Sequence, residues 1–206
     1  MISTCHQFIF IHAPKTGGNS IQLVLAPLSD DHLTVNPGQD GRERFGVAGP
    51  VTQRKHATLA DYRARLGAEL DRFQVIVTAR DPLTRAVSFY YSPHLWTREA
   101  ELGQQPAFGR TRFEQEMKRL RNVAAMLTIA GEFHRPDQIL RFESLAADLA
   151  TMAIALGLPP LAPLPHVNAS AAAETLREQT LADPWVRGLV AERFSEDYER
   201  FGYSKP

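Results

Sequence analysis

A lysine, two glycines and several hydrogen-bonding side chains follow one another near the start of the chain, as Pro14-Lys15-Thr16-Gly17-Gly18-Asn19-Ser20. The lysine supplies a positive charge, and the threonine, asparagine and serine add donors. The apolar run at 8–11 predicts a buried strand before this segment, and residues 20–25 predict a helix after it. Backbone N–H groups and the positive end of a helix dipole then point to one place. The segment therefore predicts a site for a phosphate-like group.

The order of these residues differs from the usual nucleotide-binding P-loop. In the motif G-x-x-x-x-G-K-[ST] the lysine follows the second glycine. Here Lys15 precedes both glycines. The loop therefore differs from the usual nucleotide P-loop in its order, although it is still predicted to bind a phosphate-like group.

A second strand followed by a helix carries its own cation. The apolar run at 73–79 ends at Arg80, Asp81 is placed to cap a helix and Pro82 to open it. Arg85 and Ser88 are three residues apart and share one face of that helix. A guanidinium and a hydroxyl suit a phosphate monoester. For Arg85 an ion pair with an acidic residue that supports the fold is an equal alternative.

Both segments resemble motifs of sulfotransferases that use 3′-phosphoadenosine 5′-phosphosulfate (PAPS). The first resembles their 5′-phosphosulfate loop, Pro-Lys-Thr-Gly-Gly-x-Ser, and the second their 3′-phosphate motif, Arg-x-Pro-x-x-Arg-x-x-Ser-x-Tyr. The resemblance implies that residues 14–20 bind the phosphosulfate, and that Arg80 and Ser88 bind the 3′-phosphate. Asn19 departs from the usual threonine or serine but keeps a donor.

The resemblance extends over nearly the whole chain. The segments at 54–59, 139–145, 165–170 and 198–203 are similar to parts of bacterial sulfotransferases related to those acting on glycosaminoglycans. The family implies a fold like that of P-loop nucleotide hydrolases, a PAPS co-substrate, no metal ion, and a carbohydrate or other small alcohol as acceptor. Because the long insertions and membrane anchor of the Golgi relatives are missing, their polysaccharide substrates do not carry over directly.

His56 is the predicted catalytic base, with Lys15 neutralising the charge that develops on the leaving group. Imidazole titrates near neutral pH and can accept the proton of a hydroxyl. By resemblance His56 occupies the position of the family's catalytic histidine. The alternative is that His56 only stabilises a helix start. His12 and His94 are rival candidates.

Aromatic and arginine side chains gather in the segment 91–111, namely His94, Trp96, Arg98, Phe108 and Arg110. Such side chains suit a sugar or aromatic acceptor. An ordinary surface loop is an equally good interpretation. The sequence names no acceptor.

Composition restricts the class of protein. The 206 residues suit a single domain over 1–206, with 23 basic and 23 acidic side chains. This balance gives no global field for nucleic acid or an anionic membrane. Cys5 is the one cysteine, which excludes an internal disulfide. Because no apolar run is long enough for a signal or a membrane span, a cytoplasmic protein is expected.

The elements that must position these residues alternate along the chain. Strands are predicted at 8–11, 33–35, 73–79 and 138–141, and loops at 36–50, 100–109 and 158–165. Helices are predicted at 20–25, 59–66, 82–91, 111–131, 145–156, 173–179 and 184–198. This alternation predicts an α/β fold with a parallel central sheet flanked by helices. Ligands of such sheets bind at the carboxyl ends of the strands.

Two other functions remain open from the sequence. The first is a P-loop-type kinase or phosphotransferase, which would need one polyphosphate site and Mg²⁺ ligands. No acidic residue follows a hydrophobic strand in a clear metal-binding setting. The second is a nucleotide-binding module without catalysis.

Overall fold

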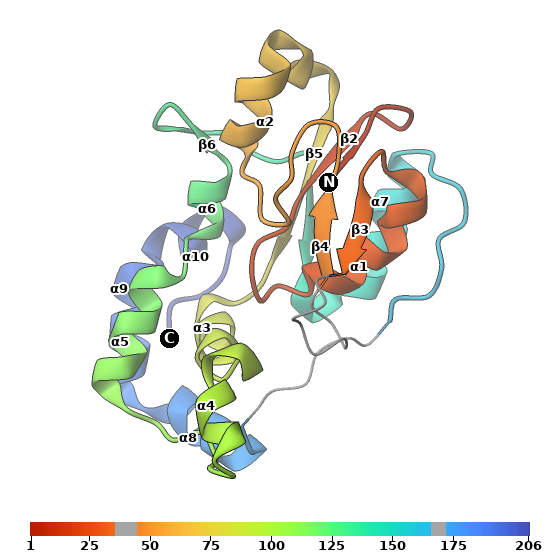
Figure 1. Cartoon of the computed structure of the whole chain (residues 1–206). Helices are drawn as coiled ribbons and strands as arrows, with labels where there is room; N and C mark the ends of the chain where they lie inside the picture. Colours follow the sequence, from red (N-terminus) through yellow and green to blue (C-terminus); the bar gives the residue numbers. More distant parts are fainter. Residues whose placement is uncertain (36–44, 166–171) are drawn as a thin grey trace. The chain divides into compact units, whose positions relative to one another are not determined.

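The computed structural model describes residues 1–35, 45–165 and 172–206. The chain forms two compact units (Figure 1). The first consists of Met1–Ala79 and Val123–Asn168, and the second of Arg80–Asn122 and Ala169–Pro206. Within the described residues, no helix is long and apolar enough to cross a membrane.

The first unit is built on a sheet whose described strands run in the order β1-β2-β5-β8. Their bounds are β1 Ile2–Ser3, β2 Phe8–Ile11, β5 Gln74–Ala79 and β8 Gln138–Arg141. β1 is an antiparallel edge strand, whereas β2, β5 and β8 are parallel. The carboxyl ends of the three parallel strands therefore lie at one edge of the sheet, as the apolar runs predicted.

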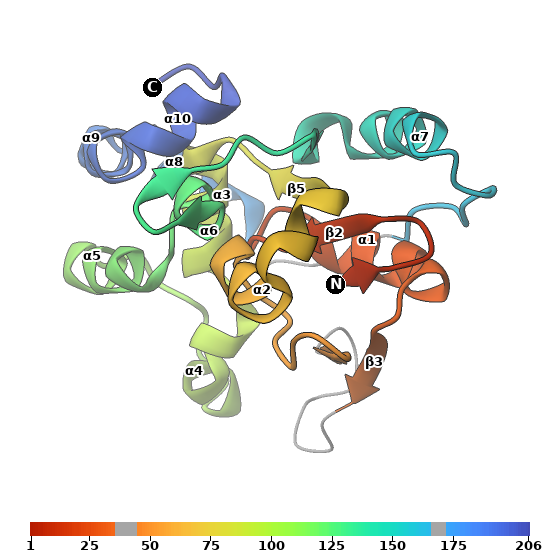
Figure 2. The same ribbon diagram turned by 90° about the horizontal axis from the view of Figure 1, so that it is seen from above.

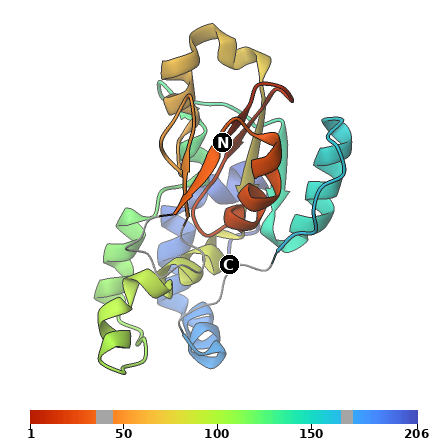
Figure 3. The same ribbon diagram turned by 45° about the vertical axis from the view of Figure 1, so that its right-hand side comes forward.

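Helices cover both faces of this sheet. They are α1 Gly18–Leu25, α2 Leu59–Leu66, α6 Val123–Met126 and α7 Leu145–Ala155. Figures 1 and 2 show α1 and α7 on one side of the strands and α2 and α6 on the other, and Figure 3 shows α7 beside α1. Phe8, Phe10 and Ile76 of the strands pack with side chains of α1 and α7 in a buried cluster. The predicted α/β fold, with parallel central strands flanked by helices, is confirmed.

Two short hairpins complete the first unit. They are formed by β3 His32–Val35 with β4 Phe45–Ala48, and by β6 Thr128–Ile129 with β7 Glu132–Phe133. The prediction of a loop over 36–50 is wrong for Phe45–Ala48, and residues 36–44 lie outside the described chain. Gly46 pairs with Thr34, whose hydroxyl would lie 2.4 Å from a Cβ added at Gly46. Gly46 contributed to the prediction of a loop, but in the structure it allows the Thr34 side chain to approach the backbone closely.

The second unit is helical. Its helices are α3 Pro82–Tyr90, α4 Thr97–Glu101, α5 Arg110–Arg119, α8 Glu174–Ala182, α9 Pro184–Arg193 and α10 Ser195–Phe201. Four 3₁₀ helices occur along the described chain, at Ala26–Leu28, Gly67–Arg72, Pro93–Leu95 and Phe142–Ser144. Tyr90, Tyr91, Phe113 and Phe194 belong to the buried core of the second unit.

Two predicted helices are interrupted. The helix predicted over 111–131 ends at Arg119, because Leu120 is extended, with ψ 113°, and buried. The chain passes from the second unit back to the first between Asn122 and Val123. The helix predicted over 184–198 is interrupted at the buried Phe194, between α9 and α10. In both places the burial of a single side chain outweighs a continuous helical pattern.

Candidate active site

The loop between β2 and α1 contains two residues in the left-handed backbone region. Lys15 and Gly17 both have positive φ angles, 66° and 82°. Gly17 is the N-cap of α1 and has no side chain to bond the first N–H groups of the helix. The start of α1 therefore has no side-chain cap, and the backbone N–H of Ser20 donates to the Gly17 carbonyl at 3.1 Å. The positive end of the helix dipole lies at this loop.

Thr16 holds this loop in place from the inside. Its hydroxyl is completely buried, donates to the carbonyl of Ala13 at 2.7 Å and lies 2.6 Å from the hydroxyl of Thr78 on β5. The Thr16 side chain thus ties the loop to the neighbouring strand. The Thr16 hydroxyl is therefore engaged within the protein.

Gly17 is packed by residues that follow β8. A Cβ added at Gly17 would lie 2.8 Å from Leu145 Cδ2 and 3.1 Å from Phe142 Cδ2. The Phe142 side chain is nonetheless 41% exposed. Phe142 therefore adjoins the loop at the same edge of the sheet. The sequence did not single it out, because only the parallel pairing of β5 with β8 reveals its position.

We expect Gly17→Ala to lower the free energy of unfolding by about 1–3 kcal/mol, through positive-φ strain and overpacking against Leu145. Gly188→Ala is the matched control. Gly188 lies within α9 with nothing within 4 Å of an added Cβ, so alanine there should stabilise slightly. Urea unfolding of both variants measures the contrast, and equal effects would contradict it.

His56 lies just before α2 and is exposed. Thr58 caps this helix, and the side chain of Asp61 accepts from the backbone N–H of Thr58, so that a capping box fixes the helix start. His56 Nδ1 lies 2.9 Å from the carbonyl oxygen of His12. A carbonyl only accepts, so Nδ1 carries the proton and the neutral ring has its lone pair on Nε2. This is the tautomer that a general base needs at Nε2.

The rival histidines differ from His56 in their surroundings. His12, at the end of β2, is 4% exposed, and burial lowers its pKa well below the ordinary value, with smaller effects from His56 and Lys55. Burial also lowers the pKa of Lys55 to about 8. His94 is exposed in the 3₁₀ helix Pro93–Leu95 of the second unit. His56 thus combines exposure with a fixed tautomer.

Arg80 and Ser88 belong to the second unit, at the start of α3 and along it. The Asp81 side chain accepts from the N–H of Thr84 at 2.8 Å, and Pro82 is the first helical residue, as predicted. Arg80 Nε donates to the hydroxyl of Thr84 at 3.2 Å. Thr84 and Ser88 are four residues apart within α3 and share one side of the helix, and the Arg80 side chain reaches Thr84 from before the helix start. Arg80 also follows Ala79, the last residue of β5, directly in the chain.

Arg85 has the structural role that was one of its two predicted alternatives. It is 1% exposed, and its guanidinium lies 3.1 Å from the carboxylate of Asp197 and 2.7 Å from the carbonyl of Arg121. Burial lowers the pKa of Arg85 to about 10, against the opposing effect of Asp197. Arg85 therefore supports the second unit.

The segment 91–111 is partly engaged in packing. Trp96 is buried, with its indole N–H bonded to the carbonyl of Tyr90 and the Arg112 guanidinium 3.7 Å from its ring centre. Phe108 packs on the core of this unit. His94 and Arg98 remain exposed. A surface pocket of ≈ 260 Å³ is lined by Pro93, Trp96, Ala100, Gly103, Gln104, Gln105 and Pro106.

One predicted segment, the asparagine-containing loop at 165–170, lies outside the described residues apart from Pro165.

No curated protein and no solved structure matches the chain. The sequence does match a family model, described as the sulfotransferase family, over residues 1–204. This match covers both compact units. It includes the loop at 14–20, His56, Arg80 and the helix α3. The chain therefore belongs to the sulfotransferase family.

Proposed function

We propose that this protein transfers a sulfuryl group from PAPS to a hydroxyl group of a carbohydrate or another small alcohol. Its family carries out sulfuryl transfer and generally uses PAPS as donor. The observation that supports the proposal most is the loop before α1, where Lys15 and Gly17 have positive φ angles and the N-terminus of α1 carries no side-chain cap.

The donor-binding residues are proposed on the same basis. Pro14, Lys15, Thr16, Gly17, Gly18, Asn19 and Ser20 bind the 5′-phosphosulfate. Arg80 and Ser88 bind the 3′-phosphate, in keeping with the bond from Arg80 to Thr84, which lies one turn before Ser88 in α3. The family match spans both compact units, which supports a single functional domain over 1–206.

In the proposed reaction His56 Nε2 takes the proton of the acceptor hydroxyl. The acceptor oxygen forms a bond to sulfur as the bond from sulfur to the phosphate oxygen breaks, in line. Lys15 and the loop N–H groups neutralise the negative charge left on that phosphate oxygen. The segment 91–111 is proposed to select the acceptor, with His94, Arg98 and Arg110 among its exposed polar side chains.

Calorimetry with 3′,5′-adenosine bisphosphate, AMP and ATP tests the donor. We expect the bisphosphate to bind without metal and about 10–100-fold more tightly than AMP, because only it offers a 3′-phosphate to Arg80. Arg80→Ala should remove most of this preference. Arg72→Ala is the control, since Arg72 is an exposed arginine paired with Glu69. Mg²⁺-dependent ATP binding tighter than bisphosphate binding would instead identify a phosphotransferase.

A further inference from the structure

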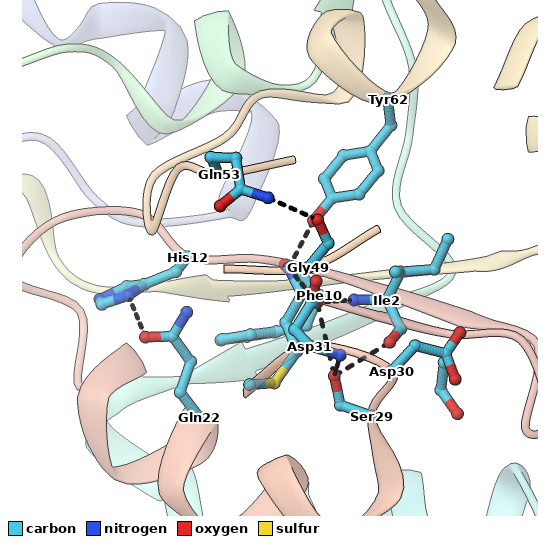
Figure 4. A network of polar contacts seen from close by, with 12 residues as sticks. Ile2, Phe10, His12, Gln22, Ser29, Asp30, Asp31, Gly49, Gln53 and Tyr62 are labelled. Carbon is cyan, nitrogen blue, oxygen red and sulfur yellow. Dashed lines mark hydrogen bonds and ion pairs between the residues drawn. The ribbon is translucent and has the colours of Figure 1, made fainter. Parts of the chain in front are cut away.

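His12 lies between α1 and His56. It follows Phe8 and Phe10 at intervals of two residues, so its side chain points to the α1 face of the sheet. Its Nδ1 lies 2.9 Å from the side-chain oxygen of Gln22, on α1 (Figure 4). Both side chains are buried, with Gln22 completely inaccessible.

The first turn of α1 is shaped around this ring. A Cβ added at Gly18 would lie 2.0 Å from His12 Cδ2 and 2.5 Å from His12 Nε2. Gly18 is the first residue of α1, so the imidazole rests directly on the helix N-terminus. Gly18 and Gln22 are one turn apart and hold His12 on the same side of the helix.

On its other side His12 contacts the proposed base twice. The centres of the two imidazole rings are 4.5 Å apart, at an interplanar angle of 58°. The carbonyl of His12 accepts the hydrogen bond from His56 Nδ1. Because burial lowers its pKa, His12 stays neutral near pH 7 and can lie beside a His56 that takes up a proton.

We propose that His12 is a positioning residue. Its ring, held by Gln22 and Gly18, fixes the orientation of the His56 ring and so keeps His56 Nδ1–H on the backbone carbonyl of His12. This inference rests on the proposed role of His56 as base. In this arrangement His12 connects the proposed base to α1. The loop at 14–20, α1 and His56 are then held in a fixed geometry relative to one another.

The test compares His12→Ala with His12→Phe. Without the ring, His12→Ala should lower kcat about tenfold, because a misplaced catalytic group is costly, and leave bisphosphate affinity within about twofold. His12→Phe keeps a ring against Gly18 and His56 and should recover most of the turnover. Long-range ¹⁵N NMR should show one His56 tautomer in the wild type. In His12→Ala the backbone carbonyl remains, but a His56 ring that has lost its packing contact can turn away from it, so a mixture of tautomers is expected.

Two further variants keep the test decisive. If His12→Ala does not fold, Gln22→Leu releases the ring and should give a smaller loss of kcat with the same tautomer change. Tyr62→Phe is the control, because it removes a buried hydroxyl that accepts a hydrogen bond from the N-terminal ammonium of Met1 in the same unit. The inference is overturned if folded His12→Ala or Gln22→Leu keeps wild-type turnover and a single His56 tautomer. Full turnover in His56→Ala would instead refute the proposed base itself.

Discussion

Replacing His56 by alanine is expected to lower kcat about 10²–10⁴-fold, because the acceptor hydroxyl then loses its proposed general base. The side chain is exposed, and its Nδ1–H donates to the His12 carbonyl, so the lone pair needed for proton transfer is on Nε2. Affinity for 3′,5′-adenosine bisphosphate should change little, since binding is assigned to residues 14–20, Arg80 and Ser88. Steady-state kinetics and calorimetry on the same preparation separate the two effects.

His94→Ala is the matched control for this prediction, because His94 is also exposed and belongs to the proposed acceptor segment. His94→Ala should raise KM for the acceptor and leave the pH dependence of kcat unchanged. Added imidazole should restore part of the turnover of His56→Ala, which only a proton-transfer role explains. Unchanged kcat in His56→Ala would show that another group removes the proton.

The largest expected effect on stability follows from the buried ion pair of the second unit. Arg85→Met should lower the free energy of unfolding by about 3–5 kcal/mol, because it leaves the Asp197 carboxylate uncompensated in the interior. Asp197 is 2% exposed and lies 3.1 Å from the Arg85 guanidinium. Lys118→Ala removes the exposed partner of Glu114 and should be nearly neutral. Chemical unfolding measures all of these variants.

The double variant Arg85→Met/Asp197→Leu distinguishes a structural from a ligand-binding role. Removing both charges should recover much of the lost stability, because no unpaired ion remains buried. If Arg85 is structural, this folded double variant binds 3′,5′-adenosine bisphosphate like the wild type. A marked loss of affinity in a stable double variant would show that Arg85 also contacts the nucleotide.

Much of the local structure could be predicted because its causes are local. The apolar runs at β2, β5 and β8, the Thr58–Asp61 capping box and the Asp81-Pro82 start of α3 all depend on residues within one turn or strand. Such patterns act through hydrogen bonds between neighbours in sequence. The parallel sheet followed from the alternation of these elements.

The interruptions of the helices could not be predicted in this way. Leu120 and Phe194 fit a helical pattern, yet both end up buried where a helix ends or begins. The strand Phe45–Ala48 was missed because a glycine usually weakens a strand, whereas Gly46 faces Thr34 closely. In each case a tertiary contact outweighs local propensity.

The sequence by itself determined the loop of residues 14–20, the helix start at Arg80–Pro82 and the histidine before α2, because these are defined by residue type and spacing. Only the tertiary structure decided what each side chain does. It turned Thr16 inward to Thr78, paired Arg85 with Asp197 across 112 positions, and placed His12 against His56 across 44. The physical reason is that burial and ion pairing depend on residues far apart in the chain, which no local pattern specifies.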